Sequence, residues 1–451
     1  MTLEAANLAR VAGPSVHATD VKVLAVPADE GACAGDVQPG ASAPGPPGDG
    51  GHLAAYDLGP RTPCAQRTMR AEHDRSMTVS CRPRSERGSA TCPHCGYDTW
   101  VSAEHDDERA TMSGNATYRH TQAAVLSICA VDAPVVVTSD EMDQRLLTTY
   151  ERVGLKPGML ARLAGIHERR WWPEGVSFTE GAATAGGKAL AEAGVDPSRV
   201  GLMVNTSVSR EHLEPSMAVQ IHHALGMPTS CLNFDLANAC LGFVNGMQLA
   251  ATMIDSGQID YALIVNGESS RHTQEVTLDR LSRPDATADD VLSQFATLTL
   301  GSGAAAMVLG RADAHPQAHR IVGGVARAGT EHHDLCVGDL EWMRTDTRGL
   351  LQAGIALSRA TWEDARAEFD WSDMDRYIAH QISQVHVRAM CEALDIPPER
   401  LPLTFPTRGN MGPAAVAFTL AMEADSLVAG DRVLMMGVGS GLNVSCLEIA
   451  W

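Results

Sequence analysis

Cys240 is the residue whose surroundings best suit nucleophilic chemistry. It follows a strand-like segment that ends in the small residues Ala237-Asn238-Ala239, and it precedes an amphipathic helical pattern over 241–254. The dipole of a helix favours an anion at its N-terminus, and the thiolate is the nucleophilic form of cysteine. The small neighbours leave room for an incoming acyl group. The alternative is a buried structural cysteine, which is common for this residue type.

Two further side chains can act on a carbonyl group. His380 follows the apolar segment 377–379, and a histidine at a strand end that faces a cleft can polarise a carbonyl or accept a proton. Asn410 precedes a helical pattern over 413–428, and its amide can hydrogen-bond a thioester oxygen. Alternatively, His380 is a structural histidine and Asn410 is a helix N-cap.

A glycine-rich segment follows the last aliphatic run of the chain. Its sequence is Gly437-Val438-Gly439-Ser440-Gly441-Leu442. Glycines allow backbone N–H groups to approach a ligand, so the segment is a candidate oxyanion hole. It lacks the spacing of a dinucleotide-binding fingerprint and that of the GxSxG turn of α/β-hydrolases.

The elements that must position these residues alternate between two types. Short aliphatic runs at 200–205, 261–266 and 432–436 are typical of strands buried on both faces. Helical patterns lie between them, at 240–256 and 413–428. This alternation predicts a layered α/β fold.

An internal repeat relates the two parts of this fold. The tetrapeptide LGMP at 225–228 starts 15 residues before Cys240, and LDIP at 394–397 starts 16 residues before Asn410. In each copy a glycine and an aliphatic strand follow the helix. The repeat therefore predicts two similar halves with Cys240 and Asn410 at equivalent strand-to-helix turns, which would meet at a pseudo-two-fold axis.

Residues 1–120 differ from the rest of the chain in composition and in apolar patterning. They are rich in Gly, Pro, Ala, Asp and Arg, as in the segment 40–51, and they show no apolar periodicity. We expect a disordered extension. Met77 or Met112 would serve equally well as the start of the protein, and the upstream residues would then not be translated.

One candidate metal site lies in this extension. Cys92 and Cys95 form a CxxC motif, which can supply half of a zinc site. The remaining ligands would come from Cys81, His73 or His105, which are poorly spaced. An accidental CxxC is the favoured interpretation, so we expect no metal.

Composition excludes several classes of protein. The chain has 451 residues with 55 Asp and Glu against 35 Lys and Arg, a net charge of −20, and nucleic-acid binders need a basic surface instead. No apolar run approaches the ~20 residues of a membrane span. The N-terminus has no apolar signal core, so we expect a cytoplasmic protein. The odd count of 11 cysteines in a large chain does not indicate a disulfide scaffold.

The motifs resemble those of ketoacyl synthase III enzymes in the thiolase superfamily, over residues 120–451. The resemblance implies a Cys–His–Asn catalytic set at Cys240, His380 and Asn410. It is carried by the segments Ala239-Cys240, Ala379-His380-Gln381, Gly409-Asn410, Gly165-Ile166-His167-Glu168-Arg169-Arg170 and Leu300–Ala305.

Within that group the chain is most similar to the OleA-type enzymes of bacterial long-chain olefin biosynthesis. The resemblance implies a five-layer αβαβα fold, with an N-terminal half at 121–315 and a C-terminal half at 316–451, in a homodimer. It also implies a reaction that joins two fatty acyl-CoA molecules head to head into a 2-alkyl-3-oxoacyl product, without a cofactor. The matching segments are Asn205–Arg210, Leu213–Ser216, Ala237–Cys240, Gly409–Pro413 and Gly439–Asn443.

This reaction needs a base for the α-proton of the second acyl-CoA. Glu214 is the candidate, because it lies on a loop before Pro215, where loss of solvent would raise the pKa of its carboxyl. The resemblance implies that it enters the site of the partner subunit; without the resemblance it would be an exposed loop glutamate. Ser383 stands where ketoacyl synthase III usually has Asn, which disfavours a malonyl-carrier-protein substrate.

Further roles concern the oxyanion hole, the CoA moiety and one charged segment. The backbone N–H groups of Cys240 and Ser440 are expected to form the oxyanion hole. Arg162 and Arg170 are candidates for binding the CoA moiety. The charged segment 270–299 is either a lid or acyl-channel wall, or a surface insertion.

Three rival functions remain open at this point. The first is a ketoacyl synthase III of fatty acid biosynthesis that uses malonyl-carrier protein and releases CO₂. The second is an acyl-CoA thioesterase, in which water takes the acyl group from Cys240. The third is a non-enzymatic binding protein in which the N-terminal CxxC is the active part.

Overall fold

The computed structural model describes residues 80–82, 98–100 and 116–451 except 340. The chain divides into two units, Met1–His105 and Asp106–Trp451. In the first unit, β1 (Ser80–Arg82) pairs antiparallel with β2 (Asp98–Trp100). Most of the predicted extension, the predicted start sites Met77 and Met112, and the candidate zinc ligands Cys92, Cys95, His73 and His105 lie outside the described residues. The end of the predicted extension is wrong, because residues 116–119 form a strand that pairs within the second unit.

The second unit contains two sets of strands that share one hydrogen-bonded network. The first set has the order β4-β10-β9-β7-β8 and the second has the order β11-β16-β15-β14, and β4 and β11 join them through only two residue pairs. The bounds of the first set are β4 (Ala123–Asp132), β7 (Leu202–Asn205), β8 (Leu232–Asp235), β9 (Tyr261–Glu268) and β10 (Gly303–Arg311). Those of the second are β11 (His319–Ala328), β14 (Arg376–Ala379), β15 (Arg432–Gly439) and β16 (Asn443–Ala450), with β3 (Ala116–Arg119) beside β11.

The two sets repeat the same pairing pattern. In the first, β10 lies antiparallel between β4 and β9, and β9 is parallel to β7. In the second, β16 lies antiparallel between β11 and β15, and β15 is parallel to β14. The internal repeat predicted from the sequence is therefore present, with β7 and β14 as equivalent strands.

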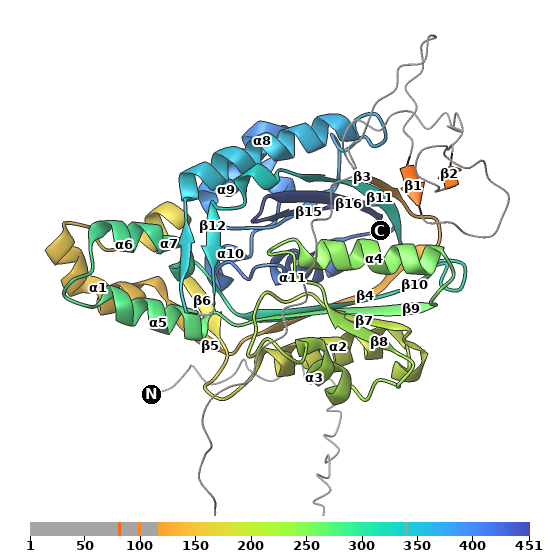
Figure 1. The fold of residues 1–451 in the computed structure, drawn as a ribbon, viewed down its shortest axis with the longest axis horizontal. Helices are drawn as coiled ribbons and strands as arrows, with labels where there is room; N and C mark the ends of the chain where they lie inside the picture. Colours follow the sequence, from red (N-terminus) through yellow and green to blue (C-terminus); the bar gives the residue numbers. More distant parts are fainter. Residues whose placement is uncertain (1–79, 83–97, 101–115, 340) are drawn as a thin grey trace, which may run out of the picture. The chain divides into compact units, whose positions relative to one another are not determined.

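Helices complete five layers, αβαβα, as Figure 1 shows. Two helices, α4 (Gly242–Asp255) and α11 (Ala414–Glu423), form the central layer. The outer helices α2 (Phe178–Ala193) and α3 (Met217–Ala224) cover the first sheet, and α8 (Thr347–Ala365) and α9 (Gln384–Leu394) cover the second. The predicted fold class is confirmed.

Strand β9 shows why its first five residues, Tyr261–Val265, form an uninterrupted hydrophobic run. Every residue from Tyr261 to Glu268 is buried. Leu263 and Val265 pack into the core formed with α2 and α3, whereas Ala262 and Ile264 pack into the central core formed with α4 and α11. A strand with a helical layer on each face has no solvent side, so polar residues do not alternate along it.

A helical lobe lies beside these layers. It contains α1 (Ser139–Val153), α5 (Arg271–Leu281), α6 (Ala288–Ser293) and α7 (Phe295–Leu298), which share a separate apolar core with β5 (Val135–Thr138) and β6 (Glu168–Trp171). The segment 270–299 is thus a packed part of the molecule. Its Gln274 is fully buried, and its amide oxygen accepts a hydrogen bond from Trp171 Nε1 at 2.6 Å.

The remaining elements are short. Strands β12 (Cys336–Gly338) and β13 (Met343–Thr345) pair with each other, α10 (Phe405–Arg408) precedes the Asn410 turn, and a π-helical turn spans Leu160–Ala164. Among the described residues, none of the helices has the length and apolarity that crossing a bilayer requires.

Candidate active site

Cys240 lies in a tight turn between β8 and the first residue of α4. Ala239 has a φ of 45°, which is uncommon for a residue with a Cβ and is found most often where the surrounding structure imposes it. Gly242 starts α4 in close contact with the backbone of Thr206, since a Cβ at Gly242 would lie 2.7 Å from the Thr206 carbonyl oxygen. This close approach fixes Cys240 at the N-terminal end of a buried central helix.

The protonation state of the Cys240 thiol in the free chain differs from the one expected from the sequence. Burial raises the pKa of the Cys240 thiol to about 12, and the charges of Cys336 and Glu268 act in the same direction. The expected preference for the thiolate is therefore wrong for the free chain, because the loss of hydration opposes the anion. The thiol must lose its proton as it attacks.

His380 stands at the end of β14 and is 7% exposed. Its backbone N–H donates to the Met436 carbonyl at 2.8 Å, which extends the β14–β15 pairing by one residue. Burial lowers its pKa to about 4, the nearby His386 adds to the shift, and the Gly412 backbone opposes it. At neutral pH the imidazole is uncharged, so it can accept a proton or donate one hydrogen bond.

Asn410 is held in the equivalent turn before α11. Its backbone N–H donates to the Thr299 carbonyl at 2.8 Å, and its carbonyl accepts from Gly301 N–H at 2.9 Å. Its side-chain Oδ1 accepts a hydrogen bond from Gly412 N–H at 3.0 Å. Asn410 thus makes the capping-type bond that we considered as an alternative, but this bond uses only Oδ1 and orients the Nδ2 donor.

Glu268 lies near the Asn410 turn and acts electrostatically on Cys240, and sequence reasoning did not identify it. It ends β9 and is 7% exposed. Its Cδ lies 3.8 Å from the position that a Cβ of Gly412 would occupy, and its charge acts on Cys240. Burial raises the pKa of its carboxyl to about 7. The only sequence signal was an acidic residue shortly after the apolar run 261–265.

The glycine-rich segment packs against the Cys240 turn. A Cβ at Gly439 would lie 2.9 Å from the Asn238 carbonyl oxygen, and one at Gly437 would lie 2.3 Å from Leu241 Cδ1. Asn443 Nδ2 also donates to Asn238 Oδ1 at 3.4 Å. Ser440 follows Gly439 directly, so the two predicted oxyanion-hole residues, Cys240 and Ser440, lie in adjoining segments.

Glu214 is not part of this cluster within one chain. It lies on the loop between β7 and α3 and is exposed, and its neighbour Leu213 is 97% exposed. The desolvation that we expected for its carboxylate is therefore absent in the single chain.

The two candidate CoA-binding arginines differ in solvent exposure and in their pairing with carboxylates. Arg162 is exposed, its guanidinium donates to the carbonyls of Gly158 and Pro157, and within the described residues no carboxylate pairs with it. Its own carbonyl accepts from Gln384 Nε2 at 2.8 Å, four residues beyond His380. Arg170 is half-buried and paired with Glu168 at 3.2 Å. Arg162 thus keeps an unneutralised charge near the site.

Ser383, which replaces the usual Asn, has a partner that sequence reasoning missed. Its Oγ lies 2.8 Å from His386 Nδ1. Burial lowers the pKa of His386 to about 4. The pair is thus a neutral hydrogen-bonded unit beyond His380.

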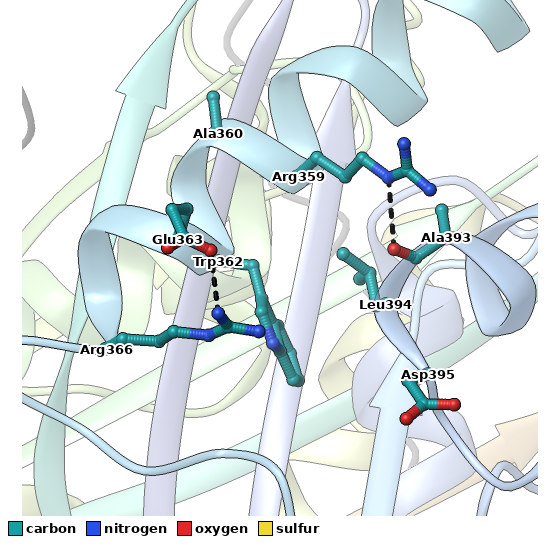
Figure 2. A pocket seen from close by; sticks show the side chains of 8 residues that line it. All are labelled: Arg359, Ala360, Trp362, Glu363, Arg366, Ala393, Leu394 and Asp395. Carbon is teal, nitrogen blue, oxygen red and sulfur yellow. Dashed lines mark hydrogen bonds and ion pairs between the residues drawn. The ribbon is translucent and has the colours of Figure 1, made fainter.

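A separate cavity of about 400 Å³ lies between α8 and the end of α9 (Figure 2). Arg359 and Arg366 line it, and they are bonded to the Ala393 carbonyl and to Glu363. None of the candidate catalytic residues lines it. Within the described ranges, no group of three or more His, Cys, Asp or Glu side chains is arranged to hold a metal ion.

Comparisons with known proteins identify the family. The family model for 3-oxoacyl-[acyl-carrier-protein] synthase III matches residues 234–327, and its C-terminal counterpart matches 365–451. The chain is 43% identical to an acyl-CoA:acyl-CoA alkyltransferase of Xanthomonas campestris pv. campestris, over 73% of this chain and 98% of that protein. It is 37% identical to the protein of the same name from Shewanella oneidensis, over 74% and 100%.

Solved structures show the same similarity. A structure of Xanthomonas campestris OleA with bound lauric acid and lauroyl-CoA is 41% identical, with a TM-score of 0.72, over 74% of this chain and all of that one. A cerulenin-bound structure of the same protein gives a TM-score of 0.73 at 42% identity, over 74% and 98%. The similarity covers the two halves that carry the candidate site.

Proposed function

The chain belongs to the acyl-CoA:acyl-CoA alkyltransferase family, a branch of the ketoacyl synthase III-like acyltransferases of the thiolase superfamily, and from this premise we propose its reaction in detail. It condenses two long-chain fatty acyl-CoA molecules into a 2-alkyl-3-oxoacyl product, without decarboxylation, in olefin biosynthesis. The observation that supports the proposal is that Cys240 and Asn410 precede the two central helices and His380 follows β14, within a match that covers 73% of this chain and 98% of the relative.

In the first half-reaction Cys240 Sγ attacks the carbonyl carbon of one acyl-CoA. The thiol proton leaves as the bond forms, and His380, which is neutral at pH 7, is the group able to accept it. The oxyanion rests on the backbone N–H groups of Cys240 and Ser440. The C–S bond to CoA then breaks, CoA takes the proton from His380 and leaves as its thiol, and an acyl-thioester remains on Cys240.

In the second half-reaction the other acyl-CoA becomes a carbon nucleophile. A base removes its α-proton, and the enolate oxygen accepts hydrogen bonds from His380 and from Asn410 Nδ2. The α-carbon attacks the Cys240 thioester, the new C–C bond forms, and the Cys240 thiolate leaves. His380 serves as a hydrogen-bond donor to the enolate in this half-reaction, and the Asn410 amide is not a base. We therefore assign removal of the α-proton to Glu214.

Glu214 fits this role only if a second copy of the chain covers it. The edge strand β8 pairs on one side with β7, and Leu232 on β8 is 52% exposed. Leu213, beside Glu214, is 97% exposed. A homodimer formed across this edge would bury these apolar side chains and carry Glu214 into the partner's site, away from solvent.

The remaining assignments belong to the same proposal. Arg162 binds a phosphate of CoA, with Arg170 as a weaker candidate, and the enzyme works in the cytoplasm without a cofactor. The catalytic chain divides near residue 315 into a half that supplies Cys240 and a half that supplies His380 and Asn410. The segment 270–299, which belongs to the helical lobe, lines the acyl channel.

A single substrate tests the function. The protein is incubated with one long-chain acyl-CoA alone, and the products are identified by mass spectrometry. We expect a 2-alkyl-3-oxo product carrying two acyl chains. Free fatty acid without C–C bond formation would indicate a thioesterase. Turnover that requires malonyl-carrier protein and releases CO₂ would indicate an ordinary ketoacyl synthase III.

A further inference from the structure

The loop that carries Glu214, residues 206–216, is fixed at its two ends rather than at its tip. It leaves β7 after Asn205 and enters α3 at Met217. The tip, which includes Leu213 and Glu214, is exposed. The contacts at the two ends therefore determine where the Glu214 carboxylate is presented.

Glu268 holds the first end. Its Oε1 accepts a hydrogen bond from Val208 N–H at 2.8 Å. Its Oε2 accepts from Ser209 N–H at 3.1 Å and from the Ser209 hydroxyl at 2.6 Å. The Ser209 Oγ also accepts from Ser269 N–H at 2.9 Å, which ties the loop to the chain that follows β9.

Asp235 holds the second end. Its two oxygens accept from Met217 N–H and Ala218 N–H, each at 2.9 Å, at the start of α3. Arg210 lies between the two carboxylates: its Nε is 3.7 Å from Asp235, and its guanidinium donates to the Ser207 and Ser209 carbonyls. The loop thus runs between two anchoring carboxylates.

Only Glu268 also lies at the candidate active site. It is close to Gly412, and its charge acts on Cys240, whereas Asp235 contacts α3 and Arg210. Its burial is unusual for a carboxylate, and it raises the pKa of Glu268 to about 7 in spite of three hydrogen-bond donors.

We infer that Glu268 is a positioning residue for the condensation step: by accepting hydrogen bonds from Val208 and Ser209 it fixes the loop that presents Glu214. The inference rests on the proposed function, in which Glu214 removes the α-proton. A carboxylate is suited to this task because both oxygens accept. A glutamine would turn an NH₂ group toward an N–H or O–H donor and lose at least one bond.

The test separates the two half-reactions in the full-length protein. Glu268→Gln is mixed with one long-chain acyl-CoA, acylation of Cys240 is followed by intact mass and CoA release, and the condensed product is measured separately. We expect condensation to fall by up to about 100-fold, the size of a 1 Å misplacement. Acylation should not decrease, because removal of a nearby negative charge does not disfavour the Cys240 thiolate.

Two further variants keep this test decisive. Ser209→Ala removes only the loop hydroxyl that donates to Glu268, and it should reduce condensation in the same direction by less. Glu448→Gln changes another buried carboxylate, which is bonded to Trp371 and Arg432, and should leave both half-reactions intact. Wild-type condensation in Ser209→Ala and Glu268→Gln, or equal losses of acylation and condensation in them, would overturn the inference.

Combination with Glu214→Gln distinguishes this inference from the proposed function. If Glu268 acts through Glu214, Glu268→Gln should cause no further loss of condensation in a Glu214→Gln background. A further loss of the same size would show that Glu268 acts independently and would refute the positioning role while leaving Glu214 as the base. Wild-type condensation by Glu214→Gln alone would instead refute the base assignment, and this inference with it.

Discussion

Oδ1 of Asn410 accepts a hydrogen bond from the backbone N–H of Gly412 at 3.0 Å, and this bond sets the direction of the other amide atom. The contact closes the turn that begins α11, so the amide plane is held by the fold before substrate binds. Nδ2 is then a fixed donor for a thioester or enolate oxygen. An asparagine is useful here because its oxygen closes the turn while its NH₂ group remains available as a donor to the substrate.

Asn410→Asp tests this use of the amide. The aspartate keeps an oxygen for the Gly412 N–H but replaces the donor with an acceptor, which repels an enolate. Condensation should fall by about 10²–10³-fold, as for the loss of one oxyanion donor. Product formation under steady-state conditions measures the loss, and an unchanged melting temperature would show that the turn is preserved. Full activity would mean that Nδ2 does not contact the reacting oxygen.

Cys240→Ala should abolish both acyl-enzyme formation and turnover. Intact mass spectrometry should show one acyl group on the wild type and none on the variant. Cys446→Ala is the matched control, because burial raises the pKa of that thiol to about 12 as well, yet it lies in the core between β16 and the outer helices. Acylation that persists in Cys240→Ala would refute the nucleophile assignment.

Glu214→Gln should block condensation after a normal first half-reaction. The amide keeps the shape of the side chain but cannot take a proton, so condensation should fall by ~10²–10⁴-fold. Acyl-enzyme should accumulate with a single burst of CoA. Glu211→Gln, an exposed glutamate on the same loop, is the control and should condense normally. A malonyl thioester, which forms its carbanion by losing CO₂, should restore C–C bond formation.

The pKa of Cys240 predicts how its reactivity depends on pH. Because burial raises the pKa to about 12, the thiol stays protonated below that value and the thiolate fraction rises tenfold for each pH unit. Alkylation of Cys240 by iodoacetamide in the free protein should therefore keep rising from pH 7 to pH 10. A small peptide thiol levels off near its ordinary pKa of about 8.5. A plateau near pH 7 at Cys240 would show that the helix dipole prevails over burial.

Several features of the site could be predicted because they are local in the sequence. The small residues before Cys240, the strand end at His380 and the repeated spacing before Asn410 all lie within a few residues of the group they position. Hydrophobic runs predicted where the strands lie, and the repeat predicted that the Cys240 and Asn410 turns are equivalent. The pairing of β7 with β9 and of β14 with β15 agrees with that equivalence.

Burial and long-range contact were decided only by the tertiary structure. From the sequence alone, Cys240 at a helix start favoured a thiolate, but burial of the thiol in the folded chain reverses the expected shift of its pKa. Glu268 is 60 residues from Val208 in the chain, and only the pairing of β9 with β7 brings its carboxylate to the Glu214 loop. The sequence by itself determined which groups can react and which elements carry them. The protonation of Cys240 and the anchoring of the Glu214 loop required the fold, because hydration and hydrogen-bond partners depend on residues that are distant in the chain.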